Sequence, residues 1–249
     1  MTRKFGLIGF PLSHSFSRKF FTDKFTNEGI DAEYLNFEIP SITELQHIVE
    51  SHPDLEGFNI TIPFKELIIS YLDGIDQPAS QIKAVNTVKI NRSGNNVSLR
   101  GYNTDIQGFQ ESVKPLLQKY HNKALVLGTG GASKAVVKAL DNLKIESILV
   151  SRNPEEKGEI SYDDLDQDVM ESYKIIVNTT PIGTFPNIDG CPAIPFEWIT
   201  PKHLLFDLVY NPEITEFLKQ GKKRGATIKN GLEMLHLQAL AAWDIWNKE

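Results

Sequence analysis

Hydrophobic residues in the first hundred positions fall into short runs that alternate between two spacings. An apolar run near the N-terminus stops at Pro11, as a strand would, and phenylalanines then recur every three to four residues up to Gly29, as on one face of a helix. Because parallel strands are joined by helical crossovers, this alternation predicts a mostly parallel sheet. The pattern predicts strands at 4–10, 34–39 and 57–62 and helices at 16–29 and 42–49.

The pattern changes near residue 85. Two stretches typical of strands, 85–90 and 97–100, flank the turn-rich sequence Asn91–Asn95, which predicts a hairpin. Apolar strands and amphipathic helices then alternate again, which predicts a second α/β domain. This half should contain a helix at 106–120, a strand at 124–127, a helix to 143, strands at 147–150, 174–177 and 204–208, and helices after Pro212 and at 232–246.

Composition narrows the class of protein. A chain of 249 residues with a net charge of −6, 41% hydrophobic and 23% charged residues is typical of a globular protein and not of a disordered one. The net negative charge provides no basic surface for binding nucleic acid, and no apolar segment is as long as a membrane-spanning helix. Cys191 is the single cysteine, which excludes an internal disulfide and any zinc spacing of cysteines. We expect a cytoplasmic protein without a metal, nucleic-acid or membrane partner, and both monomer and homodimer stay open.

A glycine cluster follows the predicted strand at 124–127 and opens a helix, where backbone amides can bind the pyrophosphate of a dinucleotide. Gly128 and Gly130 suit the tight turn and the close phosphate approach. A P-loop is rejected because Ser133 and Ala135 replace its last glycine and its magnesium-binding Ser or Thr. A turn that only packs helix against strand is the alternative. The candidate cofactor residues here are Gly128, Thr129, Gly130, Gly131, Ala132 and Ser133.

The cofactor type is usually indicated about 20 residues further on, where NAD binders carry a carboxylate and NADP binders an arginine. Here the predicted strand ends in Ser151, Arg152 and Asn153. Arg152 can stack on adenine and pair with a phosphate, so the sequence favours NADP and a Rossmann-type domain. A solvated arginine is the alternative, and Glu155 and Glu156 would weaken any phosphate site that they faced.

Uncharged hydrogen-bonding residues concentrate at the strand ends of the first domain. In an open α/β sheet ligands bind outside such ends, so this set suits a polyhydroxylated ligand. Ser15 and Ser17 could instead cap the first helix. Lys65 and Asp105 are the candidate acid–base pair, although spacing alone does not bring them together and an exposed lysine is the alternative. The set comprises Ser13, Ser15, Ser17, Asn59, Thr61, Asn86, Thr87, Asn103 and Thr104, and the carboxyl group of Asp105 directly follows it.

Several short motifs occur in both predicted domains. They are GFPLSHSFS at 9–17, NITIPFKE at 59–66, AVNT at 84–87, GYNTD at 101–105, GTGGAS at 128–133, SRN at 151–153, NTTPIG at 178–183, DLVYNP at 207–212 and NGLEMLHLQA at 230–239. In this order, the motifs resemble those of shikimate dehydrogenases over essentially the whole chain.

The resemblance implies a reversible NADP-linked reduction of 3-dehydroshikimate to shikimate, the fourth step of the chorismate pathway to the aromatic amino acids. It also implies that the two serines hold the substrate carboxylate and that Lys65 and Asp105 are the catalytic pair. The substrate would contact Ser15, Ser17, Thr61, Lys65, Asn86, Asp105, Tyr210 and Gln238, and the nicotinamide would lie near Gly231 and Met234.

The implied architecture is an α/β enzyme with a mostly parallel substrate-binding catalytic domain at 1–103, a Rossmann domain at 104–230, and a last helix, 231–249, that packs back on the first domain. Lys83 departs from a glycine that is common in the family, and Glu233 departs from a small residue. A quinate/shikimate dehydrogenase with broader substrate or NAD use, and a non-catalytic NADP-binding sensor, are the alternatives.

Overall fold

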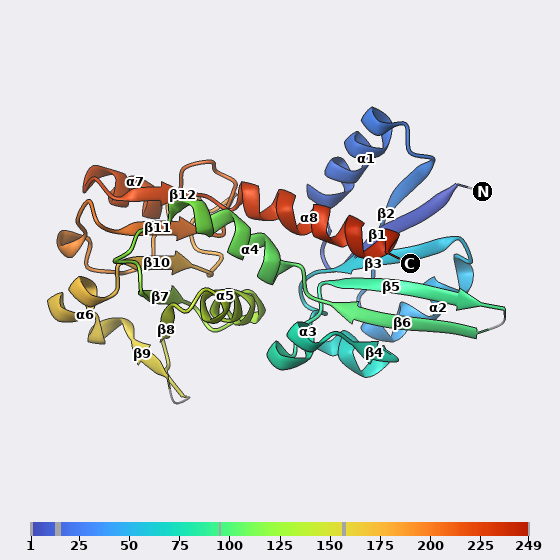
Figure 1. Cartoon of the computed structure of the whole chain (residues 1–249), viewed down its shortest axis with the longest axis horizontal. Coiled ribbons are helices and arrows are strands. Elements are labelled where there is room, and N and C mark those ends of the chain that lie inside the picture. The colour runs from blue at the N-terminus through green and yellow to red at the C-terminus, as the bar shows by residue number, and fades with distance from the viewer. Residues whose placement is uncertain (1, 13–15, 95, 156–157, 249) are drawn as a thin grey trace. The chain divides into compact units, whose positions relative to one another are not determined.

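The structure is a computed structural model of the chain that describes residues 2–12, 16–94, 96–155 and 158–248. It divides into two compact units. The first combines Met1–Thr104 with Gln238–Glu249, and the second is Asp105–Leu237. Each unit has its own six-stranded sheet with helices between the strands (Figure 1). The predicted α/β class is therefore confirmed.

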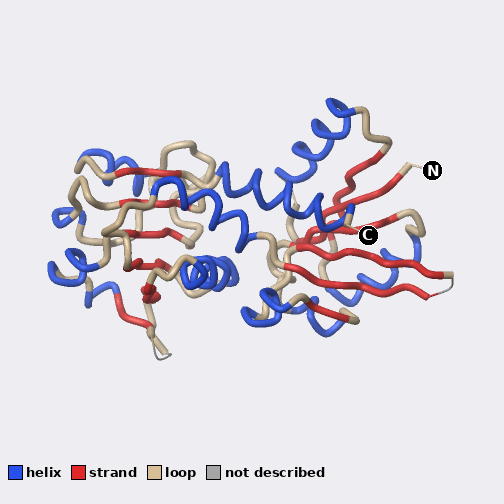
Figure 2. The backbone as a smooth tube through the Cα atoms, in the orientation of Figure 1, coloured by secondary structure: helices blue, strands red, loops and turns tan. Residues whose placement is uncertain are grey.

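The sheet of the first unit mixes parallel and antiparallel strands. Its strands are β1 (Arg3–Gly9), β2 (Ala32–Glu38), β3 (Leu55–Ile60), β4 (Gly74–Ile75), β5 (Thr87–Ser93) and β6 (Asn96–Tyr102). β1 lies between β2 and β3 and is parallel to both, whereas β5 is antiparallel to β3 and forms the predicted hairpin with β6. The carboxyl ends of β1, β3 and β6 therefore lie at the same end of the sheet as the beginning of β5, as the arrows in Figure 1 show; Figure 2 shows the loops between the elements in tan.

Short helical segments connect these strands. They are α1 (Phe16–Glu28), η1 (Ile42–Glu44), α2 (Leu45–Ser51), η2 (Leu67–Tyr71) and α3 (Gln77–Ile82). The single helix expected at 42–49 is thus divided into a 3₁₀ turn and α2. Asp76 begins α3 by accepting a hydrogen bond from the Ala79 amide at 3.0 Å, and Lys83 ends it with a left-handed backbone at φ +51°.

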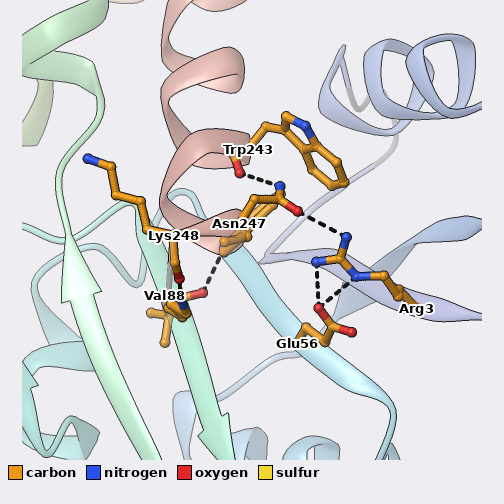
Figure 3. A network of polar contacts seen from close by, with 8 residues as sticks. Arg3, Glu56, Val88, Trp243, Asn247 and Lys248 are labelled. Carbon is orange, nitrogen blue, oxygen red and sulfur yellow. Dashed lines mark hydrogen bonds and ion pairs between the residues drawn. The ribbon is translucent and has the colours of Figure 1, made fainter. Parts of the chain in front are cut away.

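The C-terminal part of α8 (Leu232–Asn247) completes the core of the first unit. Trp246 is buried against Phe5 and Phe21 from the beginning of the chain. Its indole Nε1 donates to the Val88 carbonyl at 3.0 Å. Arg3 donates to Glu56 at 2.8 Å and to Asn247 at 3.0 Å, which ties the end of the helix to β1 and β3 (Figure 3).

The second unit has an entirely parallel sheet in the order β12-β11-β10-β7-β8-β9. Its strands are β7 (Lys123–Leu127), β8 (Glu146–Ser151), β9 (Glu159–Ser161), β10 (Ile175–Asn178), β11 (Leu204–Asp207) and β12 (Thr227–Lys229). Numbered within the unit, this is the 3-2-1-4-5-6 order of Rossmann folds. The order reverses between β7 and β10, so a dinucleotide is expected at the carboxyl ends of these two strands.

Helices of the second unit follow the sequence prediction in part. They are α4 (Asp105–Val113), η3 (Lys114–Leu116), α5 (Gly131–Asn142), η4 (Tyr162–Asp164), α6 (Gln167–Ser172), η5 (Phe196–Trp198) and α7 (Glu216–Lys223). The helix expected at 106–120 ends early, because Pro115 supplies no amide and the chain continues as η3. Asp166 begins α6 by accepting a hydrogen bond from the Val169 amide at 2.9 Å.

Candidate active site

Three of the sequence motifs meet at one end of the first sheet through backbone hydrogen bonds. The Ile60 amide donates to the Asn86 carbonyl at 2.8 Å, and the Asn86 amide donates to the Tyr102 carbonyl at 3.0 Å. The Val85 amide donates to the Lys65 carbonyl at 2.8 Å. The motifs at 59–66, 84–87 and 101–105, which are distant in sequence, are therefore neighbours in the fold.

Asn86 is the most completely fixed of the predicted substrate residues. Only 3% of it is exposed. Its Oδ1 accepts from the Thr104 amide at 2.8 Å, from the Thr87 hydroxyl at 3.0 Å and from the Thr104 hydroxyl at 3.2 Å. Because a backbone amide can only donate, the atom facing Thr104 must be the oxygen. The remaining Nδ2 group is therefore the part of Asn86 that can serve a ligand.

The other predicted substrate residues of this unit lie at the same end of the sheet. Ser17 is in the first turn of α1, and its hydroxyl bonds the Tyr34 hydroxyl. Thr61 follows β3 directly, and both it and Lys65 are half-buried. Gln238 is 7% exposed, and its Oε1 lies 3.4 Å from the Thr104 hydroxyl oxygen. Ser13 and Ser15 lie outside the described residues.

Asp105 directly follows this cluster in the chain but belongs to the second unit. It is the first residue of α4 and is 8% exposed. Its pairing with Lys65 stays a prediction. Tyr210 lies in the loop after β11, where burial raises the pKa of its hydroxyl. Such a phenol is a hydrogen-bond donor at any ordinary pH.

The glycine motif forms the expected connection between β7 and α5. Gly128 has φ +101°, and a Cβ there would lie 2.9 Å from Thr180. At Gly130 and Gly131 a Cβ would meet no atom within 4 Å, so space is open beside the first turn of α5. Gly130 is the N-cap of this helix, and no side chain caps it. An uncapped helix N-terminus with open space beside it fits a pyrophosphate.

Not every residue of the motif faces that space. Thr129 is exposed and Ala132 is half-buried, whereas Ser133 is 1% exposed. The Ser133 hydroxyl donates to the Gly130 carbonyl at 2.6 Å, which fixes the first turn of the helix. This small side chain therefore supports the loop from inside.

The predicted 2′-phosphate residues follow β8. Arg152 and Asn153 are exposed, and the Asn153 amide donates to the Ser151 hydroxyl at 3.2 Å. Arg152 is near enough to Tyr162 to lower the pKa of that phenol, although burial raises it overall. The loop thus presents an accessible guanidinium that fits the 2′-phosphate of NADP. Glu156 lies outside the described residues.

A buried carboxyl group at the end of β11 was not singled out in the sequence. Asp207 is fully buried, and it accepts from Asn178 Nδ2 at 2.9 Å, the Val209 amide at 3.0 Å and the Thr215 hydroxyl at 2.6 Å. Burial raises its pKa from 3.8 to about 6, against the effect of these hydrogen bonds. Asn178 Oδ1 in turn accepts from Thr180 at 2.6 Å. The network connects the loops that follow β10 and β11.

The predicted nicotinamide residues lie at the beginning of α8. A Cβ at Gly231 would lie 2.1 Å from the Leu208 carbonyl oxygen, so this position accepts only glycine. Met234 is 7% exposed one turn later. Glu233, whose role was open, forms an ion pair with Lys229 of β12. That pair joins the first turn of the helix to the strand before it.

Comparison with known proteins places the chain in a family. Residues 7–88 match the model of the shikimate dehydrogenase substrate binding domain. The chain is 36% identical to the shikimate dehydrogenase (NADP(+)) of Caldicellulosiruptor saccharolyticus, with 98% of this chain and 92% of that protein covered. No described helix is both long and apolar enough to span a membrane.

Solved structures agree with this similarity. Shikimate 5-dehydrogenase from Thermus thermophilus, in complex with NADP(H) and shikimate, is 30% identical with a TM-score of 0.85 and covers 98% of this chain and 93% of its own. Quinate dehydrogenase from Corynebacterium glutamicum, in complex with NAD, is 25% identical with a TM-score of 0.86, covering 99% and 94%. By near full-length identity above 30%, by fold and by motif order, the chain belongs to the shikimate dehydrogenase family.

Proposed function

We propose that this chain catalyses the reversible reduction of 3-dehydroshikimate to shikimate with NADPH, as one step of the chorismate pathway in the cytoplasm. The observation that carries the proposal is the meeting of the motifs at 59–66, 84–87 and 101–105 at one end of a sheet, in a family member with an open glycine-rich cofactor loop. The same polar residues would serve a small hydroxylated acid.

The residues present fit NADP, whose reduced form, NADPH, would supply a hydride to the ring carbonyl carbon and whose oxidised form would accept it back in the reverse direction. The amides at the start of α5 would bind its pyrophosphate, and Arg152 would bind its 2′-phosphate. Gly231 and Met234 would border the nicotinamide. The protein's contribution is then to hold two ligands at reacting distance.

Lys65 would give a proton to the substrate oxygen in the reducing direction and take it back in the oxidising direction. Asp105 would keep that lysine charged and oriented. Ser15 and Ser17 would donate to the substrate carboxylate, and Thr61, Gln238 and Tyr210 would hold the ring substituents. Asn86 would contribute its Nδ2 group to an acceptor oxygen of the substrate.

The test is an assay of shikimate-dependent NADP reduction by the purified chain and its Lys65→Ala variant. Loss of a general acid–base group costs about 10² to 10⁴ in rate, so we expect kcat to fall at least about a hundredfold with little change in the shikimate KM. A variant kcat within threefold of the parent would refute the role of Lys65. No turnover of shikimate by the parent chain would refute the proposed reaction.

A second candidate is broader specificity, with quinate or NAD as alternative ligands. It is favoured by the similarity to the quinate dehydrogenase described above, at 25% identity. Steady-state kinetics with each acid and each nucleotide decides between the two. A kcat/KM for quinate or NAD within tenfold of that for shikimate or NADP would favour the second.

A further inference from the structure

A continuous chain of buried hydrogen bonds joins two of the proposed substrate residues, Ser17 and Asn86. The Ser17 side chain is hydrogen-bonded to the Tyr34 hydroxyl. That hydroxyl in turn donates to Asn59 Oδ1 at 2.8 Å. Asn59 Nδ2 then donates to the Thr87 hydroxyl at 3.0 Å, and Thr87 donates to Asn86 Oδ1 at 3.0 Å. The three linking residues come from β2, β3 and β5, and all are at most 5% exposed.

Two backbone groups determine the direction of every bond in this chain. Asn59 Nδ2 also lies 3.3 Å from the Asn86 carbonyl oxygen, which can only accept. The Asn59 amide therefore cannot be reversed, and its Oδ1 must face Tyr34. Burial raises the pKa of Tyr34, so its single hydroxyl proton is always present and is donated to Asn59. Tyr34 can then only accept from Ser17.

The same reasoning applies at the other end of the chain. Thr87 accepts from Asn59, so its own proton is free for Asn86 Oδ1. The Thr104 amide holds the same oxygen from another direction at 2.8 Å. Among the described residues, none accepts a hydrogen bond from Asn86 Nδ2. Nδ2 is also not one of the fully buried polar atoms that lack a partner, so it is open to a ligand. Asn86 therefore presents a donor.

We propose that Tyr34, Asn59 and Thr87 are positioning residues that hold Asn86 with its Nδ2 group toward the substrate and couple it to Ser17. The inference rests on the proposed function, because Asn86 and Ser17 are substrate residues only in that reaction. It predicts that the substrate atom at Asn86 is an acceptor, such as a hydroxyl lone pair. A ligand that offered only a donor there would be rejected.

A pair of substitutions at Thr87 separates positioning from packing. Thr87→Val keeps the shape but loses the hydroxyl, whereas Thr87→Ser keeps the hydroxyl but loses a buried methyl group. One lost hydrogen bond at a buried site corresponds to about tenfold in affinity. We expect Thr87→Val to raise the shikimate KM about tenfold and Thr87→Ser to stay within threefold of the parent. The NADP KM should be unchanged in both.

Tyr34→Phe supplies the second arm, since it keeps the ring that stacks on Phe21 at 4.7 Å and removes only the hydroxyl. Because Tyr34 acts through Asn59 and Thr87, its effect on the shikimate KM should be smaller in the Thr87→Val background than alone. Trp246→Phe is the matched control. It breaks a buried hydrogen bond of the same unit, to the Val88 carbonyl, and should lower the melting temperature without changing the shikimate KM.

A measurement on the parent chain does not depend on any variant folding. In a shikimate titration followed by NMR, the side-chain amide protons of Asn86 should shift as this group becomes a donor to the ligand. The proposal is overturned if these protons do not respond at saturation, if Thr87→Ser is as impaired as Thr87→Val, or if the effects of Tyr34→Phe and Thr87→Val simply add. If the parent chain does not turn over shikimate, the proposed function fails and this inference fails with it.

Discussion

Replacing Asp207 by asparagine tests whether the buried network at the end of β11 holds a carboxyl group that resists ionisation. The group is fully buried, and its pKa is raised from 3.8 to about 6 by that burial. Asparagine keeps an oxygen for Asn178 and for the Val209 amide. It loses the acceptor of the Thr215 hydroxyl, a pH-independent cost of about 1 to 3 kcal/mol.

The pH dependence follows from the direction of the shift. Between about pH 3.8 and 6 the folded chain binds more protons at Asp207 than the unfolded chain does. The free energy of unfolding therefore falls as pH rises through this window, and the loss is complete above it. At 1.36 kcal/mol per pKa unit, ionisation of Asp207 lowers the free energy of unfolding by about 3 kcal/mol at neutral pH. About 1.4 kcal/mol of this decrease occurs between about pH 5 and 7.5.

Urea unfolding of both proteins at these two pH values isolates this contribution, because other titrating groups are common to both and cancel. The variant should gain about 1.4 kcal/mol relative to the parent between the lower and the higher pH. Asp164→Asn is the control: this exposed carboxylate has a lowered pKa, so it is ionised in both states throughout the range. A parent–variant difference at Asp207 that is the same at both pH values refutes the raised pKa.

Three other substitutions test local features. Arg152→Ala should raise the NADP KM about 10 to 150-fold more than the NAD KM in steady-state assays, since it removes a charge-assisted pair; equal losses would indicate adenine stacking alone. Gly231→Ala should destabilise the fold by about 1 to 3 kcal/mol through overpacking, because its Cβ meets a backbone carbonyl, and should therefore lower the melting temperature. An unchanged melting temperature contradicts the close approach. Lys83→Gly should raise the free energy of unfolding by up to about 1 kcal/mol by relieving its left-handed backbone, and a loss in urea unfolding would contradict this.

The elements that depend on residues close together in the sequence were predicted correctly. The turn at Asn91–Asn95 and its flanking strands gave the β5–β6 hairpin, and the apolar run before Gly128 gave β7 and the cofactor loop. Strands of two or three residues, such as β4, β9 and β12, were missed. Such short segments have no period of their own and form only because a neighbouring strand offers pairing.

The candidate site was also predicted only in part, because some of its residues are brought together by strand pairing. Asn59 and Thr87 were recognised as polar residues at strand ends, but Tyr34 was not, because it lies 25 residues from its partner Asn59 and only the β1–β3 and β1–β2 pairings bring them together. Asp207 was likewise missed, since its burial depends on its register opposite Asn178. The pairing of Lys65 with Asp105 stays a prediction.

The return of α8 to the first unit has a consequence for the order in which the protein can be built. Phe5, Phe21 and the Val88 carbonyl are made early in synthesis, but they are covered by Trp246, which follows the whole second unit in the sequence. A chain that leaves the ribosome N-terminus first therefore carries the first unit with part of its core uncovered until the second unit and the segment around residue 246 have been made. The second unit is a single uninterrupted stretch of sequence and needs no such delay, so the segment synthesised later can be the one that finishes folding first.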